Sequence, residues 1–346
     1  MSTYNLKTKK LDKSMIEITG EIPAELFESY REHAMGHIGA EMELPGFRKG
    51  HIPANILESK IPEMHILEEM AEHAIGEHYP KMLAELEIDA IGRPTIGITK
   101  VAKGNPLGFT ITTALFPTVT LPDYKKIAKD TKAGAAVEVT DEDLEKFIHD
   151  IRASRVPAKT DAEGKRIAPE ESELPVLDDA FVKSVGNFET VEDFKKKVRE
   201  NMQLERQNGA HEKHRLAIME AILDGTKTDI PELLIEAELD KMLYRMKSDI
   251  TGMGLPYEDY LKHLGKTEDV LRGEFRADAE KRVRLELALA EISKLEKITP
   301  KDEDITREVA KLMDEYKEAD QNRVTAYVIQ ILTNEAVFSF LESLSK

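Results

Sequence analysis

One short segment concentrates residues that could bind a partner. Residues 44–53 read LPGFRKGHIP, so an aromatic residue and two cations lie between prolines and glycines. Proline restricts the chain and glycine permits tight bends, which predicts a projecting loop between two helices. Phe47 near the tip is costly to leave in water unless a partner covers it, while Arg48 and Lys49 offer positive charge. Docking on a surface is one interpretation. A Phe47 tucked under its own loop, with solvated cations, is an equally weighted one.

Histidine pairs are the other residues whose spacing could bind a ligand. His33 and His37 are four apart on a predicted helix and could share a metal, and His211 and His214 are three apart. Neither pair follows the His-Glu-x-x-His pattern of zinc enzymes, and the chain has no cysteine. Both pairs are therefore interpreted as surface histidines, and the sequence predicts no metal site.

Other catalytic patterns are missing from the sequence. Without cysteine there is no thiol catalysis, disulfide or iron–sulfur cluster. There is also no Gly-x-x-x-x-Gly-Lys-Ser/Thr phosphate loop and no Gly-x-Ser-x-Gly elbow. The sequence therefore predicts no catalytic residues and no cofactor.

Composition limits the class of partner. The chain has 346 residues and a net charge of −17, so its whole surface does not coat nucleic acid or anionic membrane. The start has no signal-peptide pattern, and no run of about 18 apolar residues is present. We expect a cytoplasmic protein that does not contact a membrane.

The elements that must position the loop form a mixed N-terminal region. A hairpin is predicted over residues 3–22 with a turn near Asp12, followed by one helix from Pro23 to beyond Ile38. A second helix is expected over 62–86, and two strands, 90–101 and 109–115, flank a hairpin loop. The simplest packing is an α+β layer with helices on one face of an antiparallel sheet.

The remainder is predicted to be almost entirely helical. Residues 117–132 are expected to be extended, a helix begins at Thr140, and 156–175 is interpreted as a linker. Further helices are expected to begin near Thr190, Pro231, Tyr257, Thr267, Thr299 and Asn322. The predicted fold is thus an α+β N-terminal domain followed by an elongated all-α C-terminal domain with arms.

The Gly-Phe-Arg-Lys-Gly-x-x-Pro pattern resembles the ribosome-docking signature of the trigger factor family of bacterial nascent-chain chaperones. Segments 174–181, 229–235 and 281–292 are also similar to that family and occur in its order, so the resemblance covers nearly the whole chain. It implies contact with the large ribosomal subunit, both protein and rRNA, beside the exit tunnel. The implied ribosome-binding residues are Gly46, Phe47, Arg48, Lys49, Gly50 and Pro53. His51 departs from the lysine that the family often has.

The resemblance also implies domains and an activity that are altered here. The family normally inserts a peptidyl-prolyl isomerase domain after the helix that ends near Arg155, but residues 156–173 cannot hold about 100 residues. The expected domains are 1–117 for ribosome binding, 118–173 for an arm and linker, and 174–346 for the chaperone. We expect a non-enzymatic, ATP-independent chaperone of nascent or unfolded polypeptides, with a homodimer as one state open to the free protein.

Two other functions stay open at this point. One is a holdase or assembly chaperone that does not need the ribosome, which the His51 departure and the shortened middle favour. The other is a family member with residual isomerase activity. Met202, Met242, Met246 and Met253 lie in the helical region and could contact varied clients through their flexible thioethers, although each one singly is better interpreted as a core residue.

Overall fold

The computed structural model describes the whole chain except residues 1–3, 45–46, 48–51, 53, 133, 135–137, 158, 161–165, 168 and 346. Its contacts divide the chain into two compact units. Unit 1 comprises Met1–Leu121 with Thr226–Ile292, and unit 2 comprises Pro122–Gly225 with Ser293–Lys346. Each unit is therefore built from segments that are distant in the sequence.

A four-stranded antiparallel sheet forms the base of unit 1. Strands β1 (Lys7–Leu11), β2 (Met15–Ile22), β3 (Ala90–Lys100) and β4 (Leu107–Leu115) lie in the order β1-β2-β4-β3. Both predicted hairpins are confirmed. Alternate residues on the central strands point to one side, as the two-residue period of a strand requires. The buried set is Ile16, Ile18, Ile22, Leu107, Phe109 and Ile111.

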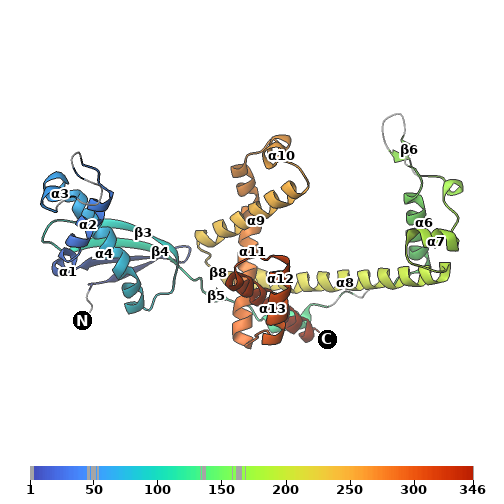
Figure 1. Ribbon diagram of the computed structural model, residues 1–346. Helices are drawn as coiled ribbons and strands as arrows, with labels where there is room; N and C mark the ends of the chain where they lie inside the picture. Colours follow the sequence, from blue (N-terminus) through green and yellow to red (C-terminus); the bar gives the residue numbers. More distant parts are fainter. Residues whose placement is uncertain are drawn as a thin grey trace. The chain divides into compact units, whose positions relative to one another are not determined.

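Four helices of the described residues follow β2, and their apolar side chains share one core with the buried face of the sheet (Figure 1). They are α1 (Ala24–Glu28), α2 (Arg31–Glu41), α3 (Ala54–Lys60) and α4 (Glu63–Glu85). The single helix expected after Pro23 is wrong, because the chain turns at Ser29, whose hydroxyl donates to the Leu26 carbonyl oxygen. Helix α4 agrees with the predicted helix over 62–86, whereas α3 was not predicted.

The second part of unit 1 is a helical hairpin. A short strand pair, β5 (Val119–Thr120) with β8 (Lys227–Thr228), precedes α9 (Glu232–Gly252), α10 (Tyr257–Leu264) and α11 (Glu268–Glu296). The predicted helix starts at Pro231, Tyr257 and Thr267 are confirmed. Apolar residues of α9 and α11 form the core between them: Ile235, Leu239, Ala279, Val283 and Leu287.

Unit 2 is organised around one long helix, α8 (Val191–Gly225), shown in green to yellow in Figure 1. Helices α6 (Asp141–Ser154) and α7 (Asp179–Val185) pack on its N-terminal half. Helices α5 (Tyr124–Asp130), α12 (Asp302–Glu315) and α13 (Gln321–Leu344) complete the unit, with α13 contacting α5, α8 and α12. The helix starts expected at Thr140 and Thr190 are confirmed, because each threonine hydroxyl accepts from the backbone N–H three residues on.

Two expectations for the middle of the chain need correction. Residues 117–132 are not extended throughout, because α5 begins after Asp123, whose carboxylate accepts from the Lys126 N–H. The expected linker also contains structure, namely a strand pair, β6 (Lys159–Thr160) with β7 (Arg166–Ile167), and a 3₁₀ turn at Glu171–Glu173. The fold class is confirmed: an antiparallel sheet with helices, then a helical region that contains only two-residue strands among the described residues.

Helix α13 bears on the expectation of no membrane segment. By length and composition it is the one helix of the described residues that could cross a membrane. It nevertheless packs within unit 2, where Val328, Val337 and Leu341 are buried. Arg215 of α8 also binds two of its carboxylates, those of Glu335 and Glu342. The helix therefore contacts the rest of unit 2 through these residues, although only 17% of its most apolar 18-residue window is buried.

Candidate functional site

The described part of the predicted docking loop presents an exposed aromatic ring. The Phe47 backbone N–H donates to the Leu44 carbonyl oxygen at 3.1 Å. The Phe47 side chain is 40% exposed, so its ring is not sealed inside the loop. Gly46, Arg48, Lys49, Gly50 and Pro53 lie outside the described residues, as does His51, and their role stays a prediction.

Both ends of this loop are anchored in the core of unit 1. Leu44 packs partly buried against that core, and Ile52 and Leu57 on the far side of the loop are buried in it. Helices α2 and α3 approach closely, because a Cβ placed on Gly39 would lie 2.6 Å from Cδ1 of Leu57. Leu44, Ile52 and Leu57 are thus the described residues beside the loop that packing holds in place, and we call them its stem.

An arginine–glutamate pair joins α2 to α4. Arg31 at the start of α2 donates two hydrogen bonds, at 2.7 and 2.8 Å, to the carboxylate of Glu63 at the start of α4. This guanidinium lowers the pKa of Glu63 by hydrogen bonding to its charged form. The pair fixes the two helix starts with the planar geometry that arginine and carboxylate share.

A buried histidine links α4 to the N-terminal segment and α2. The Tyr4 hydroxyl lies 2.8 Å from Nδ1 of His78, and the Tyr30 hydroxyl lies 2.9 Å from its Nε2. Because the Tyr30 hydroxyl donates to Glu77, its oxygen is free to accept from Nε2–H, and Nδ1 then accepts from Tyr4. Burial, helped by Lys81, lowers the pKa of His78, and burial with the Glu77 contact raises the pKa of Tyr30 to about 12.

The helices of unit 1 also expose apolar side chains. Tyr244 on α9 is 77% exposed and Met253 at its end is 79% exposed. Others on these helices and their connections are Leu233, Leu255, Leu264 and Val270. Of the four methionines considered from sequence, Met202 and Met242 pack against cores and Met246 is half-buried, so Met253 alone of them faces water.

Unit 2 carries a comparable set. Exposed apolar residues on its helices and on the segments between them are Phe147, Val176, Leu204, Leu216, Leu295, Tyr316, Tyr327, Ile329 and Ile331. They are spread over several elements rather than gathered in one pocket. Single exposed apolar residues are normal on proteins, but this many on helices of an otherwise highly charged chain provide dispersed apolar contact area.

Comparisons with known proteins agree with this architecture. A family model described as bacterial trigger factor protein matches residues 4–151, and one described as its C-terminus matches residues 190–341. Together the matches cover 300 of the 346 residues.

The chain belongs to the trigger factor family.

Individual relatives span nearly the whole chain. The trigger factor of Clostridium kluyveri is 22% identical over 99% of each sequence, and that of Natranaerobius thermophilus is 26% identical over 90% of this chain and 87% of the relative. A solved structure of the trigger factor chaperone, reported for promiscuous substrate recognition in folding and assembly, aligns with a TM-score of 0.58. That alignment covers 98% of this chain and 99% of the other at 16% identity, so it supports the shared fold.

The sequence did not predict which residues anchor the loop at 44–53 to the core of unit 1. Helix α3 was not predicted, so the burial of Leu57 and its contact with Gly39 were not foreseen. The local signal was weak, because α3 is only seven residues long and begins directly after the loop. The pairing of Glu69 with His73, four residues apart on α4, was readable from the sequence but was not considered.

Proposed function

We propose that this trigger factor family member is an ATP-independent chaperone that docks beside the exit tunnel of the large ribosomal subunit and transiently holds nascent polypeptides in the cytoplasm. The docking residues are those of the loop, Gly46, Phe47, Arg48, Lys49, Gly50 and Pro53, within the N-terminal ribosome-binding domain. The observation that carries the proposal is the exposed Phe47 ring on a stem anchored by Ile52 and Leu57.

The chemistry of the loop suits a surface of protein and rRNA. An aromatic ring on an anchored stem loses little conformational entropy when it enters a pocket, which is how a small contact can dominate affinity. The net charge of −17 repels rRNA, so attraction must come from a local cationic point such as Arg48 and Lys49. We therefore expect binding to weaken as salt rises.

Client holding follows from the dispersed apolar side chains. If a client covers ~500 Å² of apolar surface, burial at ~25 cal/mol/Å² contributes a gross binding free energy of roughly 12 kcal/mol. Association costs of about 4–15 kcal/mol offset most of this, so clients are held briefly and released without nucleotide. Exposed groups such as Tyr244 and Met253 adapt to varied sequences because they combine apolar area with either a polar tip or a flexible thioether.

The proposal includes the absence of isomerase activity. Only residues 152–189 separate the two family-model matches, which is too short for a domain of about 100 residues. The alignment with the Clostridium kluyveri relative spans 431 positions although this chain has 346 residues, so at least 85 positions of the relative have no counterpart here. Both observations support a chain without the inserted catalytic domain. A proline-peptide assay should give only the uncatalysed rate.

Ribosome co-sedimentation tests the docking proposal. The full chain should pellet with ribosomes, and the triple variant Phe47→Ala/Arg48→Ala/Lys49→Ala should stay in the supernatant. Phe147→Ala is a matched control, because Phe147 on α6 is 41% exposed and lies outside the loop. Equal pelleting of the parent and the triple variant would remove the docking claim.

A holdase that works without the ribosome is the second candidate. His51 in place of the family's frequent lysine and the spread of apolar side chains over both units favour it. This alternative expects the parent chain to suppress client aggregation while showing no measurable ribosome affinity. Measuring both properties on the same preparation separates the two functions.

A further inference from the structure

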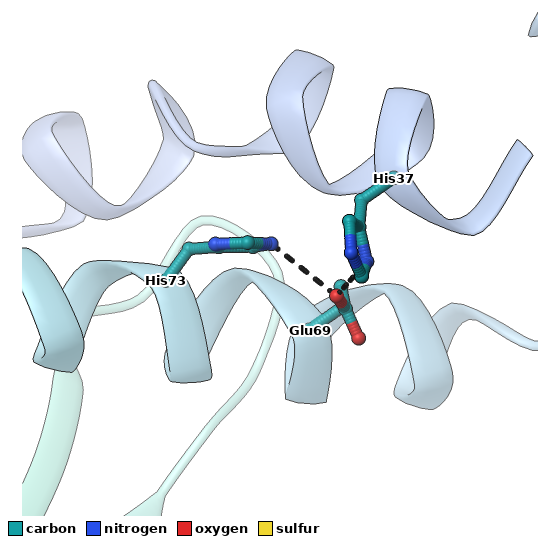
Figure 2. A group of neighbouring side chains, drawn as sticks. All are labelled: His37, Glu69 and His73. Carbon is teal, nitrogen blue, oxygen red and sulfur yellow. Dashed lines mark ion pairs between the residues drawn. The ribbon is translucent and has the colours of Figure 1, made fainter. Parts of the chain in front are cut away.

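Three side chains from two helices converge away from the docking loop. Figure 2 shows His37 reaching from α2 toward Glu69 and His73, which lie one turn apart on α4. Nδ1 of His37 is 2.6 Å from Oε1 of Glu69, and Nε2 of His73 is 3.2 Å from the same oxygen. One ligand atom from each of the three residues lies within 4.8 Å of the other two.

The contact of His73 with Glu69 is not a satisfied hydrogen bond. Nε2 of His73 is buried from solvent and has no hydrogen-bond partner of acceptable geometry, although it lies within ion-pair distance of the carboxylate. A buried polar atom without such a partner is costly and calls for an explanation. Here the nitrogen lies 3.2 Å from Oε1 of Glu69, the same oxygen that Nδ1 of His37 contacts.

The cluster opens onto a cavity of about 1150 Å³ between α2 and α4. The imidazole of His33 lies edge-on to that of His73, with ring centroids 4.5 Å apart, and restricts its orientation. Glu41 and Glu72 also line the cavity and add negative charge, while Lys81 of the same lining is paired with Glu77. The surroundings therefore attract a cation and leave room for water beside it.

The separations suit a small transition-metal ion. Zinc binds imidazole nitrogen and carboxylate oxygen at about 2.0–2.2 Å, which places tetrahedral ligand atoms about 3.3 Å apart. The two contacts to Glu69, at 2.6 and 3.2 Å, are at or below this value, and all three ligand atoms lie within 4.8 Å of one another, so small side-chain rotations reach the tetrahedral separations. Imidazole nitrogens select zinc-like metals over magnesium or calcium, which prefer all-oxygen sites.

We propose that His37, Glu69 and His73 form a binding site for one divalent transition-metal ion of the zinc type, with water as the fourth ligand. The ligand atoms are Nδ1 of His37, a carboxylate oxygen of Glu69 and Nε2 of His73. The ion cross-links α2 to α4 and so stabilises the helix that leads directly into the docking loop. This site goes beyond the chaperone function and does not depend on it.

Metal titration of the full chain tests the site. The protein, without a histidine tag and treated with chelator, is titrated with Zn²⁺ against a chromophoric competitor. We expect one tight equivalent, and we expect Glu69→Gln and His73→Ala each to weaken it at least tenfold. His65→Ala is the matched control, because His65 is an exposed histidine of α4 outside the cluster, and it should change the affinity less than twofold.

A second readout guards against misfolded variants. Zn²⁺ should raise the thermal unfolding midpoint of the parent and of His65→Ala but not that of Glu69→Gln, whose circular dichroism should match the parent. Co²⁺ should give the intense visible band of a four-coordinate site only where the cluster is intact. The proposal is overturned if Zn²⁺ binds no more tightly than Mg²⁺, or if the parent and both cluster variants bind Zn²⁺ equally.

Discussion

The proposed docking loop and the exposed helix faces present apolar groups to solvent in opposite ways. The loop shows one described aromatic ring, Phe47, on a stem held by buried residues such as Leu57. The helices of both units show many exposed apolar side chains that are spread over several elements. A concentrated contact suits a single defined partner, whereas dispersed contacts suit clients of varied sequence, because losing any one of them costs little.

Removing the anchor of the stem should have the largest effect. Leu57→Ala leaves a cavity beneath the loop, and we expect it to destabilise unit 1 by about 2–4 kcal/mol. Denaturant unfolding measures this loss, with Leu204→Ala, an exposed leucine of α8, as the control. If the stem positions the ring, ribosome affinity should fall as well, even though Phe47 is unchanged. Unaltered stability would mean that packing does not hold the loop.

Truncating the exposed ring should have the next largest effect. Phe47→Ala is expected to lower ribosome affinity about 30-fold. This equals a loss of about 2 kcal/mol of binding free energy, which is typical when an aromatic anchor is removed from an interface. Because the ring is exposed in the free chain, the free energy of unfolding should change by less than about 0.5 kcal/mol. Binding curves from ribosome sedimentation, set beside those of Phe147→Ala, measure it. A loss shared by both variants would contradict a concentrated contact.

Mild acid should distinguish the two units. Burial keeps the pKa of His78 below its ordinary value in folded unit 1, so the unfolded chain binds a proton there more readily. The resulting stability is fully present above about pH 6.5 and is lost as pH falls from there toward the folded pKa. In unit 2, hydrogen bonds from Arg206 and Thr140 hold the pKa of Asp143 far below its ordinary value, so that contribution is lost only in strong acid.

Calorimetry between about pH 7 and pH 5 checks this difference. As the pH falls across this range, the thermal unfolding midpoint of unit 1 should drop by a few degrees. His78→Gln should reduce this pH dependence, because glutamine keeps a hydrogen-bond donor and an acceptor but does not titrate. Asp143→Asn should not alter the pH dependence of the unfolding midpoint within this range. The assignment to His78 fails if the glutamine variant retains the full slope.

Single substitutions on the helix faces should have the smallest effect. Tyr244→Ser is expected to reduce suppression of client aggregation by less than about twofold, since one side chain is a small part of a dispersed surface. Adding Met253→Ser and Leu264→Ser should lower it progressively. Arg245→Ser, also exposed on α9, is the control. A light-scattering assay in which Tyr244→Ser alone abolishes protection would show that the helix faces also concentrate their binding.

Local sequence signals predicted the elements whose turns or helix starts depend on residues only a few positions away. The turn near Asp12, the capping threonines at 140 and 190, and the proline before α9 all act within a few residues, and the structure confirms them. Short helices were missed or misplaced where stability comes from distant packing. Helix α5 has seven residues and persists because Asp123 caps it and α8 and α13 contact it.

The sequence by itself determined the loop composition, most helix starts, and the family resemblance that the comparisons support. Only the tertiary structure decided that Ile52 and Leu57 anchor the loop, and that His37 meets Glu69 and His73. The sequence pairs His33 with His37 on one helix, whereas the cluster takes its other members from α4. Which helix faces meet depends on how both helices pack on a common sheet, and spacing along one chain segment does not encode that.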